Sequence, residues 1–143
     1  MALSVAEAQA ILSANFAPWV LDLNMRVEAV SEEGRARVRL PFSENLVRVG
    51  GTICGQALMT VADTVMVLAI SAKSGGFRPM TTVGQTISFM KPVSGVDAIV
   101  EARVLRLGKT LSFGEVTLRA DGREELVAHV TTTYAILGAP SPG

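Results

Sequence analysis

The chain of 143 residues is long enough for one domain with a buried core and too short for separate cofactor and substrate domains. Its thirteen basic and thirteen acidic residues cancel, and no cluster of lysine and arginine carries aromatic neighbours, which argues against a nucleic-acid-binding protein. One cysteine, Cys54, and one histidine, His129, are too few for a zinc cluster within one chain, so we expect neither a metal nor another cofactor.

The first segment predicts a short helix over residues 4–16. Ser4 is a candidate N-cap, Glu7 follows three residues later as in a capping box, and apolar residues recur at helical spacing. The segment has neither the basic start nor the uninterrupted apolar run of a secretory signal, and the lone cysteine excludes an internal disulfide. We therefore expect a cytoplasmic protein.

Residues 24–42 change to the two-residue period of β-strands. NMRVEAV and RARVRLPF alternate on either side of SEEG, with Arg35, Arg37 and Arg39 on one face and apolar residues on the other. The pattern predicts a hairpin with one solvated face.

The longest apolar segment, GQALMTVADTVMVLAISAK, predicts a helix over residues 55–73 that ends at SGG. It is short for a transmembrane span and is interrupted by polar residues, so we expect no membrane association. These residues recur at spacings of three, four and seven, which gathers them into one stripe: Gln56, Thr60, Asp63, Thr64 and Ser71. We therefore predict the core helix of a soluble fold, with the stripe facing a cleft, a partner or solvent.

Four further strands are predicted after this helix: TTVGQTISFMKP, DAIVEARVLRL, TLSFGEVTLRA and ELVAHVTTTYAIL. Their links are short, and short links favour antiparallel neighbours because a parallel crossover needs a dozen residues or more. The order of elements predicts one α+β domain over residues 1–143, a curved antiparallel sheet wrapped around one long helix, with a flexible tail at 138–143.

Asp63 needs an explanation, because an unpaired charge in an apolar helix costs several kcal/mol. The preceding sequence GGTICGQ offers backbone N–H groups at the positive end of a helix, which suit a developing oxyanion, and Asp63 could activate water or attack directly. Gly55 and Asp63 lie about 12 Å apart along the axis, too far for both to act on one carbonyl. A hydrolytic site would therefore combine two subunits, and we expect at least a dimer.

The run RVGGTICGQALMTVAD at residues 48–63, followed by ISFMKP and RLGK, resembles the hot-dog thioesterases of the phenylacetyl-CoA (PaaI-like) family. The resemblance covers residues 40–136. It implies the hot-dog fold, a homodimer that often pairs into a homotetramer, and hydrolysis of acyl-CoA thioesters without any cofactor beyond the CoA of the substrate.

The resemblance also implies roles for individual residues. Asp63 matches the catalytic carboxylate, and Gly55 matches the glycine whose N–H forms the oxyanion hole, with the amide of Gln56 as a second possible donor. Thr82 lies where some members place a hydroxyl that orients water from the facing subunit. An ordinary strand threonine explains Thr82 equally well.

Substrate binding is implied for five further residues. Lys91 and Lys109 correspond to loops that face the nucleotide, Met59 is suited to line an acyl pocket together with Met66, and Arg48 could contact the carbonyl or a CoA phosphate, although solvent exposure is the simpler explanation. The fifth is Cys54, at the position of the motif histidine, where a small buried side chain is the simpler interpretation of a lone cysteine.

Three departures from the motif leave the activity open. Cys54 replaces the histidine, Gln56 replaces the second glycine, and Arg48 takes the usual place of an asparagine, with Asn45 three residues farther upstream. A non-catalytic dimer that binds acyl-CoA is the alternative to an enzyme. A hydratase ranks lower, because that chemistry uses an Asp–His pair and no histidine is near the start of the helix.

Overall fold

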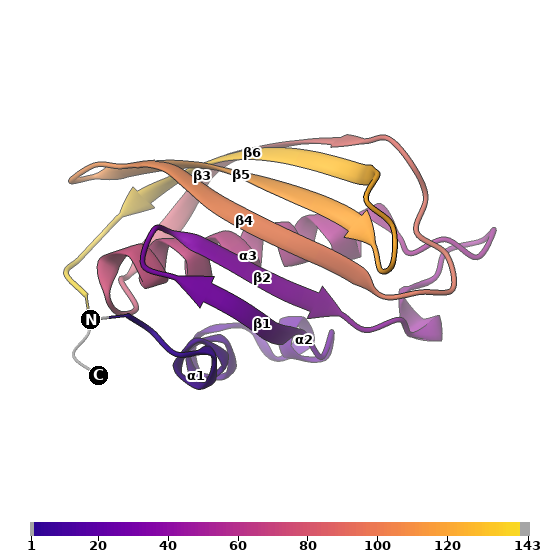
Figure 1. Ribbon diagram of the computed structural model, residues 1–143, viewed down its shortest axis with the longest axis horizontal. Helices are drawn as coiled ribbons and strands as arrows, with labels where there is room; N and C mark the ends of the chain where they lie inside the picture. Colours follow the sequence, from indigo (N-terminus) through magenta and orange to yellow (C-terminus); the bar gives the residue numbers. More distant parts are fainter. Residues whose placement is uncertain (1, 141–143) are drawn as a thin grey trace.

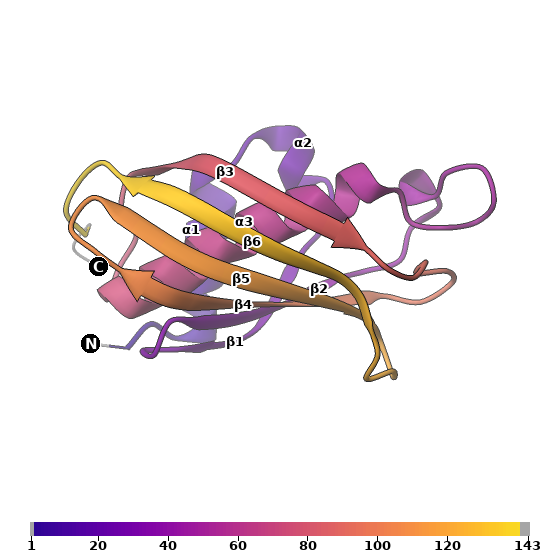
Figure 2. The ribbon, with the colours of Figure 1, turned by 90° about the horizontal axis from the view of Figure 1, so that it is seen from above.

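The computed structural model describes residues 2–140, and in it one curved sheet covers one long helix (Figures 1 and 2). The elements are α1 (Val5–Asn15), α2 (Pro18–Leu21), β1 (Arg26–Ser31), β2 (Arg35–Leu40), a 3-10 turn (Glu44–Leu46), α3 (Gly55–Ser74), β3 (Met80–Phe89), β4 (Ala98–Leu107), β5 (Leu111–Ala120) and β6 (Leu126–Ile136). All strand pairs are antiparallel, in the order β1-β2-β4-β5-β6-β3. The predicted α+β class and the wrapped helix are confirmed.

The helix α3 forms the centre of the core. It is long and apolar enough to cross a membrane, but 72% of its apolar window is buried inside this fold. Its polar stripe is exposed only in the N-terminal half, since Gln56 faces solvent whereas Thr64 and Ser71 are buried. The helix ends at Gly75, whose φ of 78° is the left-handed conformation that glycine adopts without strain.

The prediction that linked strands would be neighbours is wrong for β3 and β4. β3 pairs with β6 at one edge of the sheet, whereas β4 pairs with β2 and β5. Residues 90–97 cross the end of the sheet between them, and this crossing is stabilised because Val93 is buried and its carbonyl accepts a 2.9 Å bond from the N–H of Ile53. The crossing places the loop before α3 beside the end of β3.

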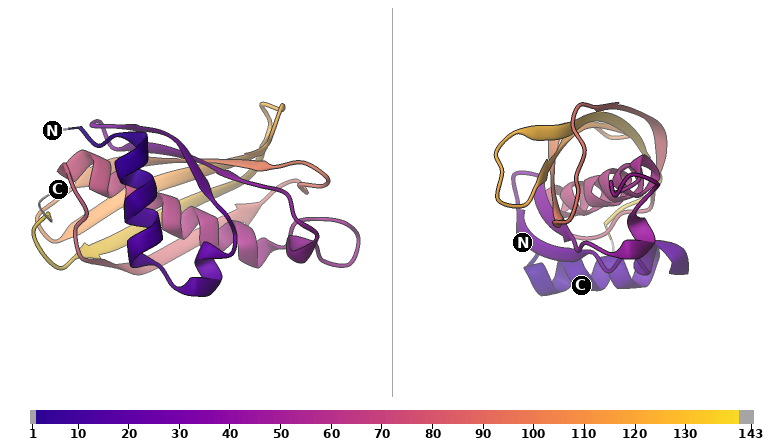
Figure 3. Two further views of the ribbon diagram at one scale, coloured as in Figure 1. Left: turned by 90° about the horizontal axis from the view of Figure 1, so that it is seen from below. Right: turned by 90° about the vertical axis from the view of Figure 1, so that its right-hand side faces the viewer.

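The N-terminal segment covers the side of α3 that the sheet leaves open, as Figure 3 shows. Ser4 and Glu7 form the predicted capping box of α1, whereas α2 and the 3-10 turn were not anticipated. At the other end, the carbonyl of Gly138 accepts a 2.9 Å bond from Arg78 Nε. The remainder of the predicted flexible tail, 141–143, lies outside the described residues.

Candidate active site

The carboxylate of Asp63 is held by side chains from two strands. The Thr82 hydroxyl on β3 donates to Asp63 Oδ1 at 2.8 Å. The Tyr134 hydroxyl on β6 donates to the same oxygen and lies 2.5 Å from the Asp63 carbonyl oxygen. Tyr134 is buried, and this burial, followed by the Asp63 charge, raises the pKa of Tyr134 far above its ordinary value. Its hydroxyl therefore stays protonated and remains a donor.

The second oxygen of this carboxylate is not engaged. Among the described residues, none donates a hydrogen bond to Asp63 Oδ2. Asp63 itself is half-buried, so the side chain is neither sealed in the core nor freely solvated. One oxygen is thus fixed in position while the other is available to accept a proton.

A pocket of about 370 Å³ lies over Asp63, between α3, β3 and the segment that contains α2. It is lined mainly by apolar and hydroxyl side chains: Phe16, Trp19, Val20, Met59, Thr60, Asp63, Thr64, Thr82 and Gln85. Gln85 Nε2 donates to the carbonyl of Met59 at 3.1 Å, which ties the middle of β3 to α3. Met59 thus lines this pocket, whereas Met66, which was expected to line an acyl pocket with it, is fully buried in the core.

The first turn of α3 carries unused donors. Cys54 is the N-cap residue, but its side chain makes no capping bond, and its own N–H donates to the carbonyl of Leu46 at 2.8 Å. The N–H groups of Gly55 and Gln56 have no acceptor within residues 2–140. Free N–H groups at the positive end of a helix are suited to an anionic oxygen.

A second pocket, of about 480 Å³, lies at this end of α3 and includes Arg48, Gly55 and Lys91. Phe89 packs against the helix start, because a Cβ built on Gly55 would meet its ring at 3.0 Å. None of the residues of this pocket lines the pocket over Asp63. Within one chain, therefore, the two groups proposed for catalysis face different pockets.

The cationic candidates do not all gather at this second pocket. Lys91 pairs with Glu125 at 2.5 Å, and Arg48 Nη1 donates to the carbonyl of Val49 at 2.9 Å. Lys109 lies in the turn between β4 and β5, at the opposite end of the sheet from the loop that contains Arg48 (Figure 1). One chain thus brings Arg48 and Lys91 together and leaves Lys109 apart.

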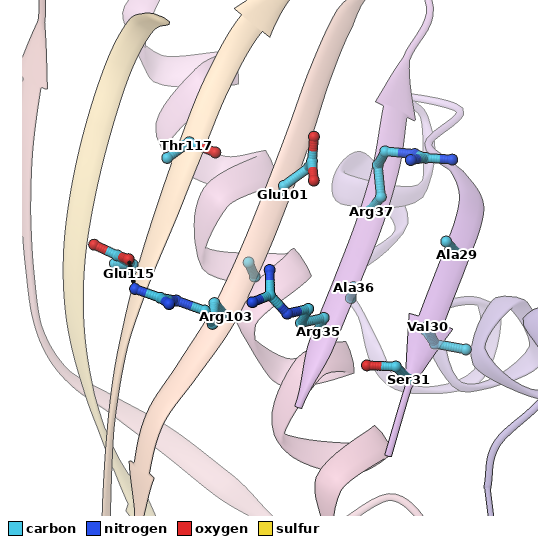
Figure 4. Close-up of a pocket in the computed structure, with 11 residues that line it drawn as sticks. Ala29, Val30, Ser31, Arg35, Ala36, Arg37, Glu101, Arg103, Glu115 and Thr117 are labelled. Atoms are coloured by element: carbon cyan, nitrogen blue, oxygen red, sulfur yellow. Dashed lines mark hydrogen bonds and ion pairs between the residues drawn. The ribbon is translucent and has the colours of Figure 1, made fainter. Parts of the chain in front are cut away.

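A third hollow lies on the outer face of the sheet, on the side away from α3 (Figure 4). Arg103 pairs there with Glu115, and Arg37 pairs with Glu28 on β1. His129 Nε2 lies 3.1 Å from the second oxygen of Glu115, and this contact, followed by that of Arg103, holds the pKa of Glu115 below its ordinary value. These charged side chains already pair with one another across neighbouring strands, so this hollow is a weaker candidate site than the pocket over Asp63.

The sequence model of the Thioesterase superfamily matches residues 50–127, more than half of the chain. The chain belongs to the thioesterase superfamily. It is therefore a thioester hydrolase, and the resemblance stated from the motif is confirmed.

Individual relatives agree with this assignment. Human acyl-coenzyme A thioesterase 13 is 29% identical over 66% of this chain and 68% of its own length. The structure of zebrafish thioesterase superfamily member 2 has 26% identity and a TM-score of 0.83, covering 95% of this chain and all of that one. The PaaI protein of E. coli, from the phenylacetic acid degradation operon, is 18% identical with a TM-score of 0.81 over 94% of both chains, and supports the hot-dog fold.

Tyr134 of this thioesterase was missed by the sequence analysis. It is the only tyrosine of the chain, and the alternation of the last strand points it inward. A phenol at an inward position needs a hydrogen-bond partner, which was the available signal. Thr82 was named, but its partner is Asp63 of the same chain, whereas the resemblance implied a role across the subunit boundary.

Among residues 2–140, no group of three or more His, Cys, Asp or Glu side chains could hold a metal ion.

Proposed function

We propose that this thioesterase hydrolyses acyl-CoA thioesters in a homodimer. In this mechanism Asp63 Oδ2 removes a proton from water, the water oxygen attacks the thioester carbonyl, and the oxyanion is stabilised by the N–H of Gly55 or Gln56 from the other subunit. Collapse of the tetrahedral intermediate expels the CoA thiolate, which takes up the proton. The observation that carries the proposal is a carboxylate with one anchored oxygen and one free oxygen beside a pocket.

The two-subunit arrangement is supported by the layout of β3 along α3. Thr82 contacts Asp63, Gln85 contacts Met59 and Phe89 contacts Gly55, so the strand runs antiparallel to the helix beside it. A two-fold axis near the middle of β3 would bring one end of this strand next to the other end of its copy. The Gly55 of the second copy would then approach Asp63 of the first.

The edge of the sheet supports the same arrangement. β3 is an edge strand with exposed residues along most of its length, including Val83 at 62% and Phe89 at 50% exposure. An open edge strand carries unpaired N–H and C=O groups that a second strand can bond. We propose that β3 pairs with its own copy; further pairing of dimers into a tetramer remains an expectation of the resemblance.

The substrate class rests on the relatives and on the charges near the helix start. The similarity to a protein named acyl-coenzyme A thioesterase supports CoA as the carrier. Arg48 and Lys91 line the pocket at Gly55, and we propose that they contact CoA phosphates. Lys109 of the second copy is a further candidate contact, and a cytoplasmic location is part of the proposal because CoA thioesters are intracellular substrates.

The test is hydrolysis of a panel of acyl-CoA thioesters by the wild type and by Asp63→Asn, measured by release of free thiol. Loss of a general base lowers kcat by about 10²- to 10⁴-fold, and we expect Asp63→Asn to fall in this range while it still binds substrate. Equal rates in both proteins would remove Asp63 from the mechanism. Saturable binding without turnover by the wild type would identify the non-catalytic alternative.

A further inference from the structure

Trp19 is a large apolar side chain held at the surface on a fixed segment. It is the only tryptophan of the chain and is 61% exposed. α2 begins with Pro18 at its first position, the N–H of Asp22 donates to the Pro18 carbonyl at 3.0 Å, and Val20 is buried in the core. The backbone around the indole is therefore anchored, while the indole itself lacks the burial that tryptophan usually has.

The indole forms part of the wall of the pocket over Asp63. Phe16 is half-buried against the core and Met59 is 37% exposed, and both line the same pocket. Together the three side chains give this pocket an apolar wall, supplied by the N-terminal segment and α3. Tryptophan, phenylalanine and methionine offer large contact areas to an apolar ligand.

We propose that Trp19 is a specificity-determining residue whose indole binds the acyl group of the thioester. The proposal rests on hydrolysis at Asp63: a carbonyl beside this carboxylate has its acyl substituent within the same pocket. An acetyl group offers one methyl to the wall, whereas an acyl chain of several carbons can cover Met59, Phe16 and Trp19. The structure thus favours thioesters of longer apolar acyl groups over acetyl thioesters.

The first experiment compares kcat/KM for octanoyl-CoA and acetyl-CoA. Trp19→Ala removes the indole, so the octanoyl group loses apolar contact area and the ratio of kcat/KM for octanoyl-CoA to that for acetyl-CoA should fall about tenfold. Trp19→Phe keeps an aromatic ring and should retain most of the wild-type ratio. Leu105→Ala is the matched control, since Leu105 is 55% exposed on β4 and lines neither pocket at α3. An equal fall for both thioesters, or a Trp19→Ala protein that becomes monomeric in light scattering, would overturn the proposal.

The second experiment reads binding without turnover. Because Trp19 is the sole tryptophan, its emission should change saturably when octanoyl-CoA is added to Asp63→Asn and should not change with free CoA. Hydrolysis by the wild type without any emission response would overturn the role of Trp19 and leave the proposed function intact. An emission response with no hydrolysis by the wild type would support the acyl site and contradict the proposed function.

Discussion

At the scale of single residues, Thr82 and Tyr134 orient the Asp63 carboxylate because both hydroxyls donate hydrogen bonds to one of its oxygens. Tyr134→Phe keeps the buried ring and removes one donor, so we expect kcat to fall about tenfold, the equivalent of one net hydrogen bond. The measurement is kcat for hydrolysis of one acyl-CoA by the wild type and by Tyr134→Phe.

No other charged group of this pocket complicates the comparison. In the described part of the chain, Asp63 is the only charged side chain that lines its pocket, and it faces Thr82 and Gln85 from β3 and Tyr134 from β6. Thr131→Val, on the exposed face of β6, serves as the control. A lower melting temperature with an unchanged kcat would show that Tyr134 has a structural role only.

At the scale of elements, the contact between β5 and α3 depends on the missing side chain of Gly114. A Cβ built there would lie 2.3 Å from Met66 Cε and 3.0 Å from the carbonyl oxygen of Arg103. Gly114→Ala should therefore lower the free energy of unfolding by about 1–3 kcal/mol, as overpacked cores do. Denaturant unfolding measures this, with Thr117→Ala on the outer face of the same strand expected to stay within about 0.5 kcal/mol of the wild type. If Gly114→Ala were as stable as the wild type, the Met66 side chain would be able to adopt another rotamer that avoids the new Cβ.

Asp97 lies just before β4 and links the start of that strand to the segment that follows β2. It accepts the N–H of Phe42 at 2.7 Å and pairs with Arg39 at 3.0 Å, and the same guanidinium contacts Glu28 and Asp121. The Phe42 N–H, and after it the Arg39 charge, hold the pKa of Asp97 below its ordinary value, whereas partial burial opposes this shift. The resulting stabilisation is present above about pH 4, the ordinary range for aspartate, and is lost as pH falls through the lower pKa of the folded protein.

We therefore expect Asp97→Asn to lower the melting temperature at pH 7 and to approach the wild type as the pH falls below the ordinary titration range of aspartate. At pH 7 the free energy of unfolding of Asp97→Asn should be about 1 kcal/mol lower than that of the wild type, because the Asp97–Arg39 pair is partly exposed. Thermal unfolding of both proteins across this pH range measures it. A constant difference at every pH would assign the effect to packing and not to the carboxylate charge.

At the scale of the whole molecule, a shared site predicts complementation between two inactive variants. Asp63→Asn removes the base, and Gly55→Pro removes the N–H of Gly55, so the experiment tests Gly55 as the oxyanion donor. Proline is accepted at the first helical position, and Cys54, with φ −67° and ψ 148°, already has the conformation required before proline. A mixed dimer would hold one intact site of its two, so co-refolded protein should recover about a quarter of wild-type activity.

The control for complementation is each variant refolded alone, together with the melting temperature of Gly55→Pro, because the ring of Phe89 must move to admit the new side chain. A mixture no more active than its components would place the whole site within one chain.

The sequence predicted the parts of this fold that depend on local pattern and missed those that depend on distant contacts. Alternation identified all six strands, and the polar stripe identified the exposed or partly exposed positions Gln56, Thr60 and Asp63 of α3 but not the burial of Thr64 and Ser71. The position of β3 at the edge could not be read from its link to β4, because pairing with β6 is decided by long-range packing. Tyr134 was missed for the same reason, since 71 residues separate it from Asp63.

The pocket over Asp63 draws on two regions of the chain. Its carboxylate and Thr82 lie within residues 50–127, which the superfamily shares, whereas Phe16 and Trp19 precede that region. In the proposed site, the carboxylate that activates water and two of the three apolar wall residues therefore come from different parts of the sequence. Exchanging between relatives only the N-terminal segment, which carries Phe16 and Trp19, should therefore change substrate choice and leave the hydrolytic reaction unaltered.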